Sequence, residues 1–373
     1  MTLIVSIVVL FCLLLWIQVK TRPFHSTNFS DRIGSGCRKV LAGKKLRPLL
    51  SNFEWKKTLA VQKGFFVLLS LLCAVLYVKP PYVLATKEES IKENYYHKFR
   101  GFVTDETIQR LEDEIILIRN DSRRDASERE EREIILNCIL EEAEEKLNAG
   151  YLLPQFAYRS LLCSIDTCAY QNLIGILGLL CLCLLFGGIY SYERQKEILP
   201  LLSATLGGRK QLIKEKGRLS FFLTLLAFFI LYIIPFLRIM WRYKRLVYPW
   251  AGIKNLTWFH TGDDNPIWLW ILLIYVARFF ILICVTKIVV YLSLLCKRLE
   301  QGWIVSIAIF LIPAWIALRF PIISFLSPLK ILEGNETFIS NGQTFLSIVL
   351  WGILAFSLSY RTKRKLRISL LNE

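Results

Sequence analysis

The sequence predicts an all-α polytopic membrane protein. Hydrophobic residues make up 54% of its 373 residues, yet it carries 47 Lys and Arg against 30 Asp and Glu. A soluble core seldom combines these features, whereas a protein with several membrane spans does, because its apolar surface faces lipid. Seven apolar stretches also reach or approach the length that crosses a bilayer. They are 2–18, 64–78, 170–190, 219–237, 267–286, 302–318 and 344–360.

Lys and Arg in short loops indicate the cytosolic side of a membrane protein. Four basic regions, 19–63, 191–218, 297–301 and the tail after 360, share one side if seven helices cross with the N-terminus outside. The sequence therefore predicts a multi-pass protein of the cell membrane with its C-terminus in the cytosol. A basic cluster after the fourth stretch lies on the opposite side. We expect that helix to run long and its side chains to reach lipid headgroups, or else a re-entrant segment. The cluster is Arg238, Arg242, Lys244 and Arg245.

This topology divides the chain into six parts. The first stretch has no positive charge before it, and this favours a retained anchor over a cleaved signal peptide. A remnant of a longer ancestral chain is an equal alternative. The second stretch is short, and we expect its helix to begin earlier. The parts are an anchor helix at 1–18, a cytosolic linker at 19–63, a transmembrane helix at 64–78, an extracytoplasmic helical domain at 79–169, a five-helix bundle at 170–360 that contains the loop 191–218, and a basic cytosolic tail at 361–373.

The predicted outer domain differs from the rest in charge. The segment 85–150 holds 18 of the 30 acidic residues and 11 of the 47 basic ones, a net charge of −7 against +24 elsewhere. Thr104 precedes one helix with apolar positions at helical spacing, and Ser127 with Glu130 forms a capping-box pattern before a second. We expect two solvated helices packed on each other. The alternative is a cap that contacts a substrate or partner.

The sequence shows no enzyme site. The glycine spacing in GCRKVLAGKK at 36–45 does not match a phosphate-binding loop, and no serine-hydrolase or metalloprotease motif is present. The three His residues are scattered and no Cys-x-x-Cys pair occurs, so a zinc site is not expected. Basic clusters indicate anchors against anionic lipid rather than a nucleic-acid surface. Cys163 and Cys168 form a candidate disulfide, with Cys138 as a third predicted outer cysteine.

The loop 191–218 is the strongest candidate for a functional contact. Charged residues begin it, an apolar ridge follows, a Gly pair breaks it and basic residues end it. One interpretation is an interfacial helix with its leucines in the headgroup region. The other is a short helix that docks in a groove of a cytosolic motor protein, with flanking charges that fix its register.

The order of residues in this loop resembles the coupling loop of type-2 ATP-binding-cassette (ABC) export permeases. An acidic residue ends a span, and an apolar pair, a Gly turn, an Arg and a Lys follow. Other segments within 51–365 also fit: 51–64 looks like the amphipathic connecting helix, 95–114 is similar to the outer domains of Gram-positive members, and 324–334 looks like a re-entrant piece. The loop residues that carry the resemblance are Glu193, Leu201, Leu202, Gly207, Arg209 and Lys216.

Two features depart from this family. Lys196-Glu197 stands where members often have Gly, and the stretch 2–18 lies outside the usual six-helix unit. In the segment that resembles the connecting helix, Ser51 and Glu54 form a capping-box pattern.

The resemblance implies a six-helix exporter permease core plus one extra N-terminal helix and an extracytoplasmic helical domain. It implies a homo- or heterodimer of permeases, each docked through 191–218 on a separately encoded ABC ATPase. ATP and Mg²⁺ would be bound by that ATPase, whereas this chain would hold no cofactor and would not be an enzyme by itself. The expected cargo is a peptide, a lipid or an amphipathic compound.

Arg278 lies deep in the stretch 267–286, where a charge costs about 3 kcal/mol on insertion scales. It could contact an anionic substrate group in a central path. The alternative is an interior Arg that pairs with a backbone carbonyl or with Tyr275.

Two other function classes remain open. The chain could be a membrane-anchored sensor or immunity protein that binds a ligand through its outer domain without transport. A passive channel is less favoured, because no span carries an evident polar lining.

Overall fold

The computed structural model of this chain consists of helices, loops and one short pair of strands in the residues that it describes. The predicted anchor helix at 1–18, most of the linker and the middle of the loop 191–218, residues 197–207, lie outside those residues. The described residues are 54–78, 86–120, 125–162, 164, 167–196, 208–243, 246–259, 264–320, 327–334 and 343–368.

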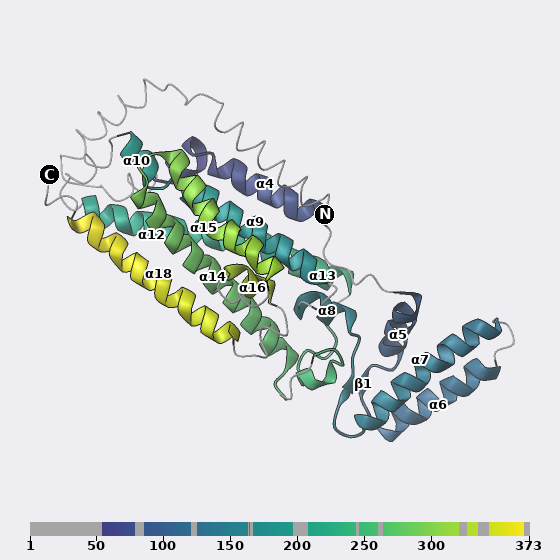
Figure 1. Ribbon diagram of the computed structural model, residues 1–373. Helices are drawn as coiled ribbons and strands as arrows, with labels where there is room; N and C mark the ends of the chain where they lie inside the picture. The colour runs from purple at the N-terminus through teal and green to yellow at the C-terminus, as the bar shows by residue number, and fades with distance from the viewer. Residues whose placement is uncertain are drawn as a thin grey trace.

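Five long apolar helices and one bent pair of shorter helices have the length and composition to cross a membrane. They form an elongated bundle (Figure 1). Each coincides with one of the six predicted apolar stretches from 64 onward, so the all-α polytopic class is confirmed. The five helices are Cys168–Gln195, Gln211–Arg242, Ile267–Leu295, Leu299–Arg319 and Phe345–Arg364, and the pair is Glu54–Val61 with Gly64–Tyr77.

The bent pair differs from the expectation of one helix that begins before 64. The π-helical segment η1 (Lys57–Val61) and helix α4 (Gly64–Tyr77) belong to two helices that meet at 57°. Lys63, between them, has a left-handed φ of 56°, a conformation that interrupts a right-handed helix. The segment 54–61 therefore turns away from the axis of α4 and packs at one end of the bundle.

Helix α9 (Cys168–Phe186) is the centre of the bundle. In its apolar window 94% of the residues are buried, against 17% in the span of α18 (Gln343–Ile368). Just after α9, the backbone passes very close to the first turn of α15. A Cβ atom on Gly302 would lie 2.0 Å from the carbonyl oxygen of Gly187, so only Gly permits this approach.

The fourth predicted stretch lies in one long helix with a π-helical turn in its middle. Pro235 cannot donate the backbone hydrogen bond that an α-helix requires, and the wider turn before it accommodates this loss. The helix continues beyond 237 and carries Arg238 and Arg242, as expected for a span that runs long. Its parts are α12 (Gly208–Phe228), η3 (Phe229–Ile233) and α13 (Ile234–Arg242).

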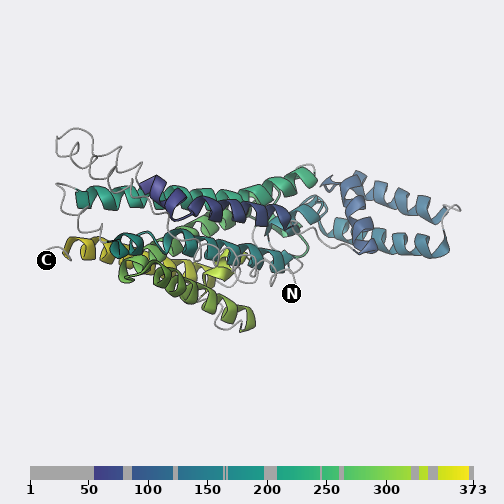
Figure 2. The ribbon, with the colours of Figure 1, turned by 90° about the horizontal axis from the view of Figure 1, so that it is seen from above.

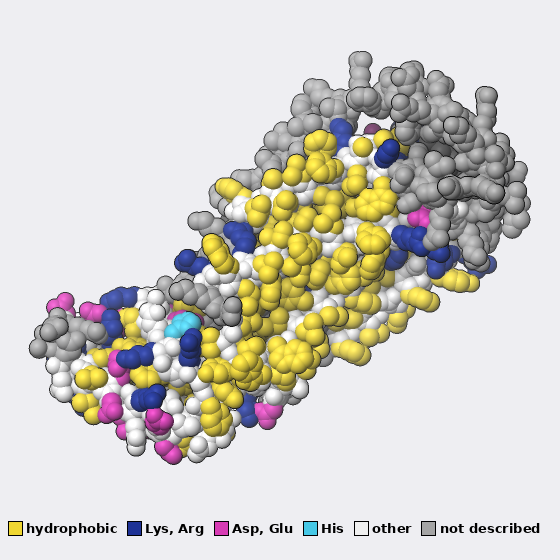
Figure 3. Space-filling model, turned by 180° about the vertical axis from the view of Figure 1, so that it is seen from behind, with side chains coloured by type: hydrophobic (Ala, Val, Ile, Leu, Met, Phe, Trp, Pro, Cys, Tyr) yellow, Lys and Arg dark blue, Asp and Glu magenta, His cyan; other side chains and the backbone are white. Residues whose placement is uncertain are grey.

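The remaining helices of the bundle expose a broad apolar surface. Figure 3 shows hydrophobic side chains along the flank of the bundle, with charged side chains mainly on the helices that project from it and at the opposite end. Exposed examples include Val276 at 58%, Ile304 at 67% and Phe356 at 79%. Such a surface suits contact with lipid. The helices are α14 (Ile267–Leu295), α15 (Leu299–Arg319), the short buried α16 (Pro328–Glu333) and α18.

A peripheral unit, residues 86–152, projects from one end of the bundle (Figure 2). It has its own hydrophobic cluster, in which Leu111, Leu136 and Ile139 are fully buried. The side of the membrane on which it lies stays a prediction. Its elements are α5 (Lys87–Lys98), β1 (Gly101–Phe102), α6 (Asp105–Asn120), α7 (Ala126–Glu145) and the antiparallel partner strand β2 (Tyr151–Leu152). The next helix, α8 (Phe156–Leu162), packs on the bundle.

The two expected helices of this unit are present, but the predicted cap of the second is wrong. Helix α7 follows Asp125 as its N-cap, so Ser127 and Glu130 lie inside the helix. The structure adds α5, where Thr86 and Glu89 form a complete capping box. Glu89 sits three residues after Thr86, the spacing that this motif requires.

Hydrogen bonds fix the peripheral unit to the bundle. The Glu93 carboxylate accepts the backbone N–H groups of Gln155 at 2.9 Å and Phe156 at 3.1 Å, at the start of α8. The Asn255 side-chain oxygen accepts the Tyr151 N–H at 2.8 Å. Asn255 ends the short helix η4 (Ile253–Asn255), in the loop between α13 and α14. The unit is therefore anchored on both sides of its strand pair.

Candidate functional site

Three segments meet at one end of the bundle, where the predicted coupling loop begins and ends. The short helix α10 (Ser191–Gln195) follows α9 after a turn, and α12 begins after the loop. The segment 54–61 contacts both through charged side chains. Four of these side chains are almost fully buried, and we call them the ion network: Glu54, Lys57, Glu193 and Lys216.

Each Lys of the ion network contacts both Glu residues. Lys57 Nζ lies 2.6 Å from Glu54 Oε2 and 2.5 Å from Glu193 Oε1. Lys216 Nζ lies 2.7 Å from Glu193 Oε1 and 3.3 Å from Glu54 Oε2. The two positive and two negative charges balance, so the network is formally neutral.

Lys216 also reaches the turn between α9 and α10. Its ammonium donates to the Ile189 carbonyl oxygen at 2.7 Å and lies 4.6 Å from the centre of the Tyr190 ring. The backbone N–H groups of Tyr190 and Ser191 donate to Ser293 Oγ on α14, at 2.9 and 3.2 Å. Lys216 thus joins α12 to the end of α9, and α14 fixes the same turn.

Burial makes the members of the ion network depend on one another. Removing an ion from water costs several kcal/mol, and this cost is offset only when opposite charges and hydrogen bonds are well placed. Because each Glu serves both Lys side chains, loss of any one member leaves a buried charge without its balance. The network therefore couples the positions of the three segments that contribute to it.

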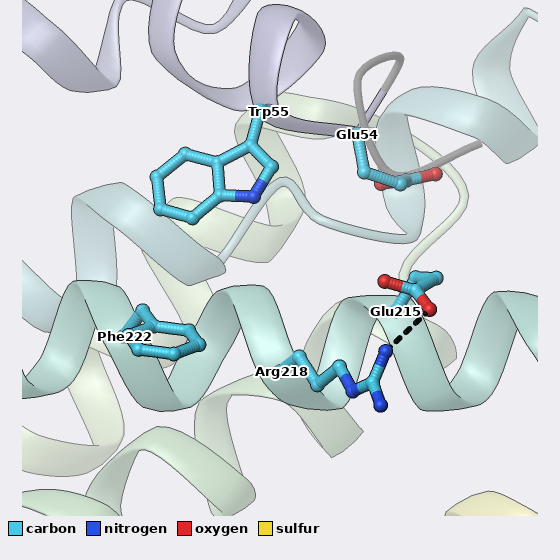
Figure 4. A pocket seen from close by; sticks show the side chains of 5 residues that line it. All are labelled: Glu54, Trp55, Glu215, Arg218 and Phe222. Carbon is cyan, nitrogen blue, oxygen red and sulfur yellow. Dashed lines mark hydrogen bonds and ion pairs between the residues drawn. The ribbon is translucent and has the colours of Figure 1, made fainter. Parts of the chain in front are cut away.

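A cavity of about 410 Å³ opens beside the ion network. Figure 4 shows the carboxylates of Glu54 and Glu215 on facing walls, with two aromatic side chains toward the other end. In the wall formed by α12, Arg218 Nη1 donates to Glu215 Oε1 at 3.0 Å. The lining residues are Glu54, Trp55, Glu215, Arg218 and Phe222.

The structure brings together two of the six residues predicted to contact an ATPase. Glu193 and Lys216 form an ion pair, but both side chains are buried inside the chain. They are therefore placed to support the loop from within rather than to touch a partner. Arg209 lies in the first turn of α12. Three predicted contacts lie outside the described residues: Leu201, Leu202 and Gly207.

Arg278, the predicted substrate contact, is fully buried on α14. Its guanidinium donates to the carbonyl oxygens of Leu332 at 2.9 Å and Glu333 at 2.7 Å, at the end of α16. It also lies over the rings of Tyr232 and Tyr275, 5.0 and 5.2 Å from their centres. The geometry corresponds to the alternative interpretation, in which backbone carbonyls and Tyr275 hold an interior Arg.

Arg238 corrects the expectation that the basic cluster after the fourth span reaches lipid headgroups. Its Nη1 donates to the Val75 carbonyl oxygen at 3.1 Å and lies 3.4 Å from those of Leu76 and Val78. These carbonyls end α4 and have no partner within that helix. Arg238 therefore caps a neighbouring helix.

The candidate disulfide is not formed in this structure. Cys168 is a free thiol whose Sγ donates to Glu333 Oε1, whereas Cys163 lies outside the described residues. Cys138, the third predicted outer cysteine, is a free and exposed thiol on α7.

Sequence reasoning missed Glu54 and Lys57 as members of a site. Glu54 was assigned to a capping box with Ser51, which lies outside the described residues, and Lys57 was counted as a topology anchor. One signal was available. Glu54 is the single acidic residue between Asp31 and Glu88, in a segment otherwise rich in Lys and Arg. An isolated acid in such a segment indicates a specific basic partner.

Comparison with protein-family models, with curated proteins and with solved structures finds no match for this chain. A function is therefore inferred from its residues and from their geometry.

Proposed function

We propose that this chain is the membrane-spanning permease subunit of an ABC exporter. It would move a peptide, a lipid or an amphipathic compound by alternating access, driven by a separate ATPase. The observation that carries the proposal is the ion network. Glu193 and Lys216, two residues of the coupling-loop pattern, stand at the two ends of the loop and pair with each other inside the bundle.

This geometry suits a loop that transmits force. A load on 197–207 would act on α10 at one end and on α12 at the other. Glu193 and Lys216 join these ends and link them to Glu54 and Lys57. Because the contacts are buried and charged, relative motion of the ends would separate opposite charges at high cost. The loop and the three adjoining segments would therefore shift as one body.

The partners follow from this role. An ABC ATPase would bind the loop from the cytosol and would itself hold ATP and Mg²⁺. A second permease, the same or different, would complete the transporter, and lipid would cover the exposed apolar surface. The N-terminus would then lie outside and the C-terminus in the cytosol. The chain would be a non-catalytic subunit and would not bind nucleic acid.

The test is co-purification with an ABC ATPase expressed together with the chain. The double variant Leu201→Asp and Arg209→Glu should abolish co-purification, because it removes an apolar contact and reverses a charge of the predicted docking surface. The matched control is Leu295→Asp with Lys297→Glu, exposed positions at the end of α14 and in the loop that follows it. Equal recovery of the ATPase with both double variants would contradict the proposal.

A second candidate function is a ligand sensor, and the separate hydrophobic cluster of the peripheral unit favours it. The chain ends that flank α6 and α7 are held close together. The Val103 N–H donates to the Gly150 carbonyl oxygen at 3.0 Å, and the Asn148 N–H donates to the Val103 carbonyl oxygen at 3.1 Å. A short Gly linker can therefore replace 104–147. The permease should keep ATP hydrolysis coupled to its membrane subunit after this deletion, whereas a sensor should lose all activity.

A further inference from the structure

The cavity beside the ion network has the chemistry of a site for a positively charged group. Glu54 is fully buried, and its Oε1 has no hydrogen-bond partner among the described residues. Glu215, on the facing wall, is 5% exposed. A buried carboxylate oxygen without a donor is costly, and an ammonium group in the cavity would supply the missing donor. The Trp55 ring in the same cavity adds a face that attracts cations.

A negatively charged group can be held at the open side of the same cavity. Arg218 is a cavity-lining residue whose side chain is 44% exposed. Its guanidinium carries five N–H donors, and its contact with Glu215 is a single bond from Nη1. A phosphate beside it would accept charge-assisted hydrogen bonds.

The charges of both signs in the cavity favour a ligand that carries both. Glu54 and Glu215 stand on facing walls, and Arg218 lies at the open side. A lone ammonium would contact the carboxylates alone. A zwitterion that brings an ammonium and a phosphate together would contact both the carboxylates and the guanidinium.

The position of the cavity on α12 indicates a lipid rather than a soluble molecule. Glu215 and Arg218 stand in the charged first part of α12, whereas Phe222 lies in its apolar part and is 53% exposed. In a helix that crosses a membrane, this change from charged to apolar residues marks the level of the headgroups. The cavity therefore meets the bilayer where a headgroup lies, and Phe222 faces the region of the acyl chains.

We propose that this cavity binds the headgroup of a zwitterionic phospholipid with a primary amine, of the phosphatidylethanolamine type. The ammonium would lie between Glu54 and Glu215 near Trp55, the phosphate beside Arg218 and the acyl chains along Phe222. The bound lipid would brace the segment 54–61 against α12. The inference goes beyond the proposed function and does not depend on it, because it requires a membrane and no ATPase.

The test uses the purified full-length chain in detergent. Short-chain phosphatidylethanolamine, phosphatidylcholine and phosphatidylglycerol are added at equal concentrations, together with phosphorylethanolamine as the soluble headgroup. The thermal unfolding midpoint is followed in each titration. We expect a saturable rise with phosphatidylethanolamine at an apparent Kd about tenfold lower than with the other two lipids. Phosphatidylcholine lacks the ammonium N–H donors that Glu54 requires, and phosphatidylglycerol lacks the positive charge.

Glu215→Gln should raise the Kd for phosphatidylethanolamine about tenfold, because a charged contact is removed. Glu300→Gln, an exposed position at the start of α15, is the matched control and should leave the Kd unchanged. Trp55→Leu is a second cavity variant, for use if Glu215→Gln does not fold, and should also weaken binding.

Three results would overturn the proposal. Equal effects of the three lipids would show that no headgroup is selected. Unchanged selectivity in the cavity variants would place the lipid elsewhere on the chain. Phosphorylethanolamine that acts as strongly as the lipid would identify a soluble amine as the ligand and exclude a lipid site.

Discussion

The two ends of the helix bundle hold their buried basic side chains in different ways. At the α10 end, Lys57 and Lys216 are balanced by the carboxylates of Glu54 and Glu193 from other parts of the chain. At the α16 end, Arg278 donates instead to the last backbone carbonyls of a neighbouring helix, as Arg238 does for α4. A helix C-terminus carries a partial negative charge, so it can receive a guanidinium without a carboxylate.

This difference has a consequence for each end. Removing an Arg at the α16 end leaves neutral carbonyls without donors, which is a limited cost. Removing a charge at the α10 end leaves a buried ion without balance, which is a larger one. The α10 end is therefore the more interdependent of the two. The predictions below test this order.

The largest effect is expected for Glu193→Gln at the α10 end. Among the described residues, the variant leaves Lys57 and Lys216 with Glu54 as the carboxylate that both contact, so the network loses one of its two negative charges. We expect a loss of about 3–5 kcal/mol of unfolding free energy, measured by denaturant unfolding in detergent. Glu193→Leu combined with Lys216→Met should recover part of this loss, because it removes one negative and one positive charge together. A double variant less stable than Glu193→Gln would contradict the description of the network as a balanced set.

Arg278→Met at the α16 end should have a smaller effect. It removes two charge-assisted hydrogen bonds to the Leu332 and Glu333 carbonyls, at an expected cost of about 2–3 kcal/mol. The unfolding free energy of Arg278→Lys should fall between those of Arg278→Met and the wild type, because an ammonium cannot reproduce the planar two-point contact. The same unfolding measurement applies. A loss as large as that of Glu193→Gln would remove the proposed difference between the two ends.

The sequence predicted the spans well because apolar length is a local property. The stretch 267–286 underestimates α14, which continues to Leu295 past Lys287, since one Lys followed by further apolar residues does not end a helix. The bend at Lys63 was not predicted, because a Lys in the left-handed conformation has no sequence signature like that of Gly.

The ion network could be predicted only in part. Glu193 and Lys216 were selected through the resemblance of the loop, but their burial and pairing were not foreseen. The contact of Glu193 with Lys57 and that of Lys216 with Glu54 join residues more than one hundred positions apart, and no periodic pattern specifies such contacts. For Arg278 the sequence left two interpretations open, because the choice depends on α16, a six-residue helix that docks beside it.

Gly334→Ala tests how closely the α16 end is fitted. Gly334 ends α16 with φ of 72°, and a Cβ atom there would lie 3.1 Å from Arg278 Nη2. We expect a loss of about 1 kcal/mol from the left-handed backbone alone, measured by the same unfolding assay. The control is Gly217→Ala on α12, where a Cβ meets no atom within 4 Å. That change should stabilise the helix slightly. Equal changes in unfolding free energy for the two substitutions would show that Arg278 does not require the left-handed turn at Gly334.

The smallest effect concerns pH and lies outside both ends, in the peripheral unit. Burial and the neighbouring Arg100 lower the pKa of His97 below 6.5. The unfolded chain therefore binds this proton at a higher pH than the folded chain. The resulting loss of stability begins as the pH falls through 6.5 and is complete below the folded pKa.

Burial raises the pKa of Glu93, whose carboxylate lies 3.9 Å from the His97 ring nitrogen Nε2, above 4.5. Its contribution has the opposite sign, because stability is lost as the pH rises through that raised pKa.

These two groups can be separated by a single substitution. In His97→Gln, hydrogen exchange of the α5 amides, corrected for the intrinsic rate, should no longer accelerate as the pH falls below about 6.5. The amides of α14, far from His97, should respond to pH alike in both proteins and serve as the internal control. If the wild type and the variant show the same pH dependence in α5, the folded state does not disfavour the imidazolium. The pH response of the peripheral unit would then come from other groups, Glu93 among them.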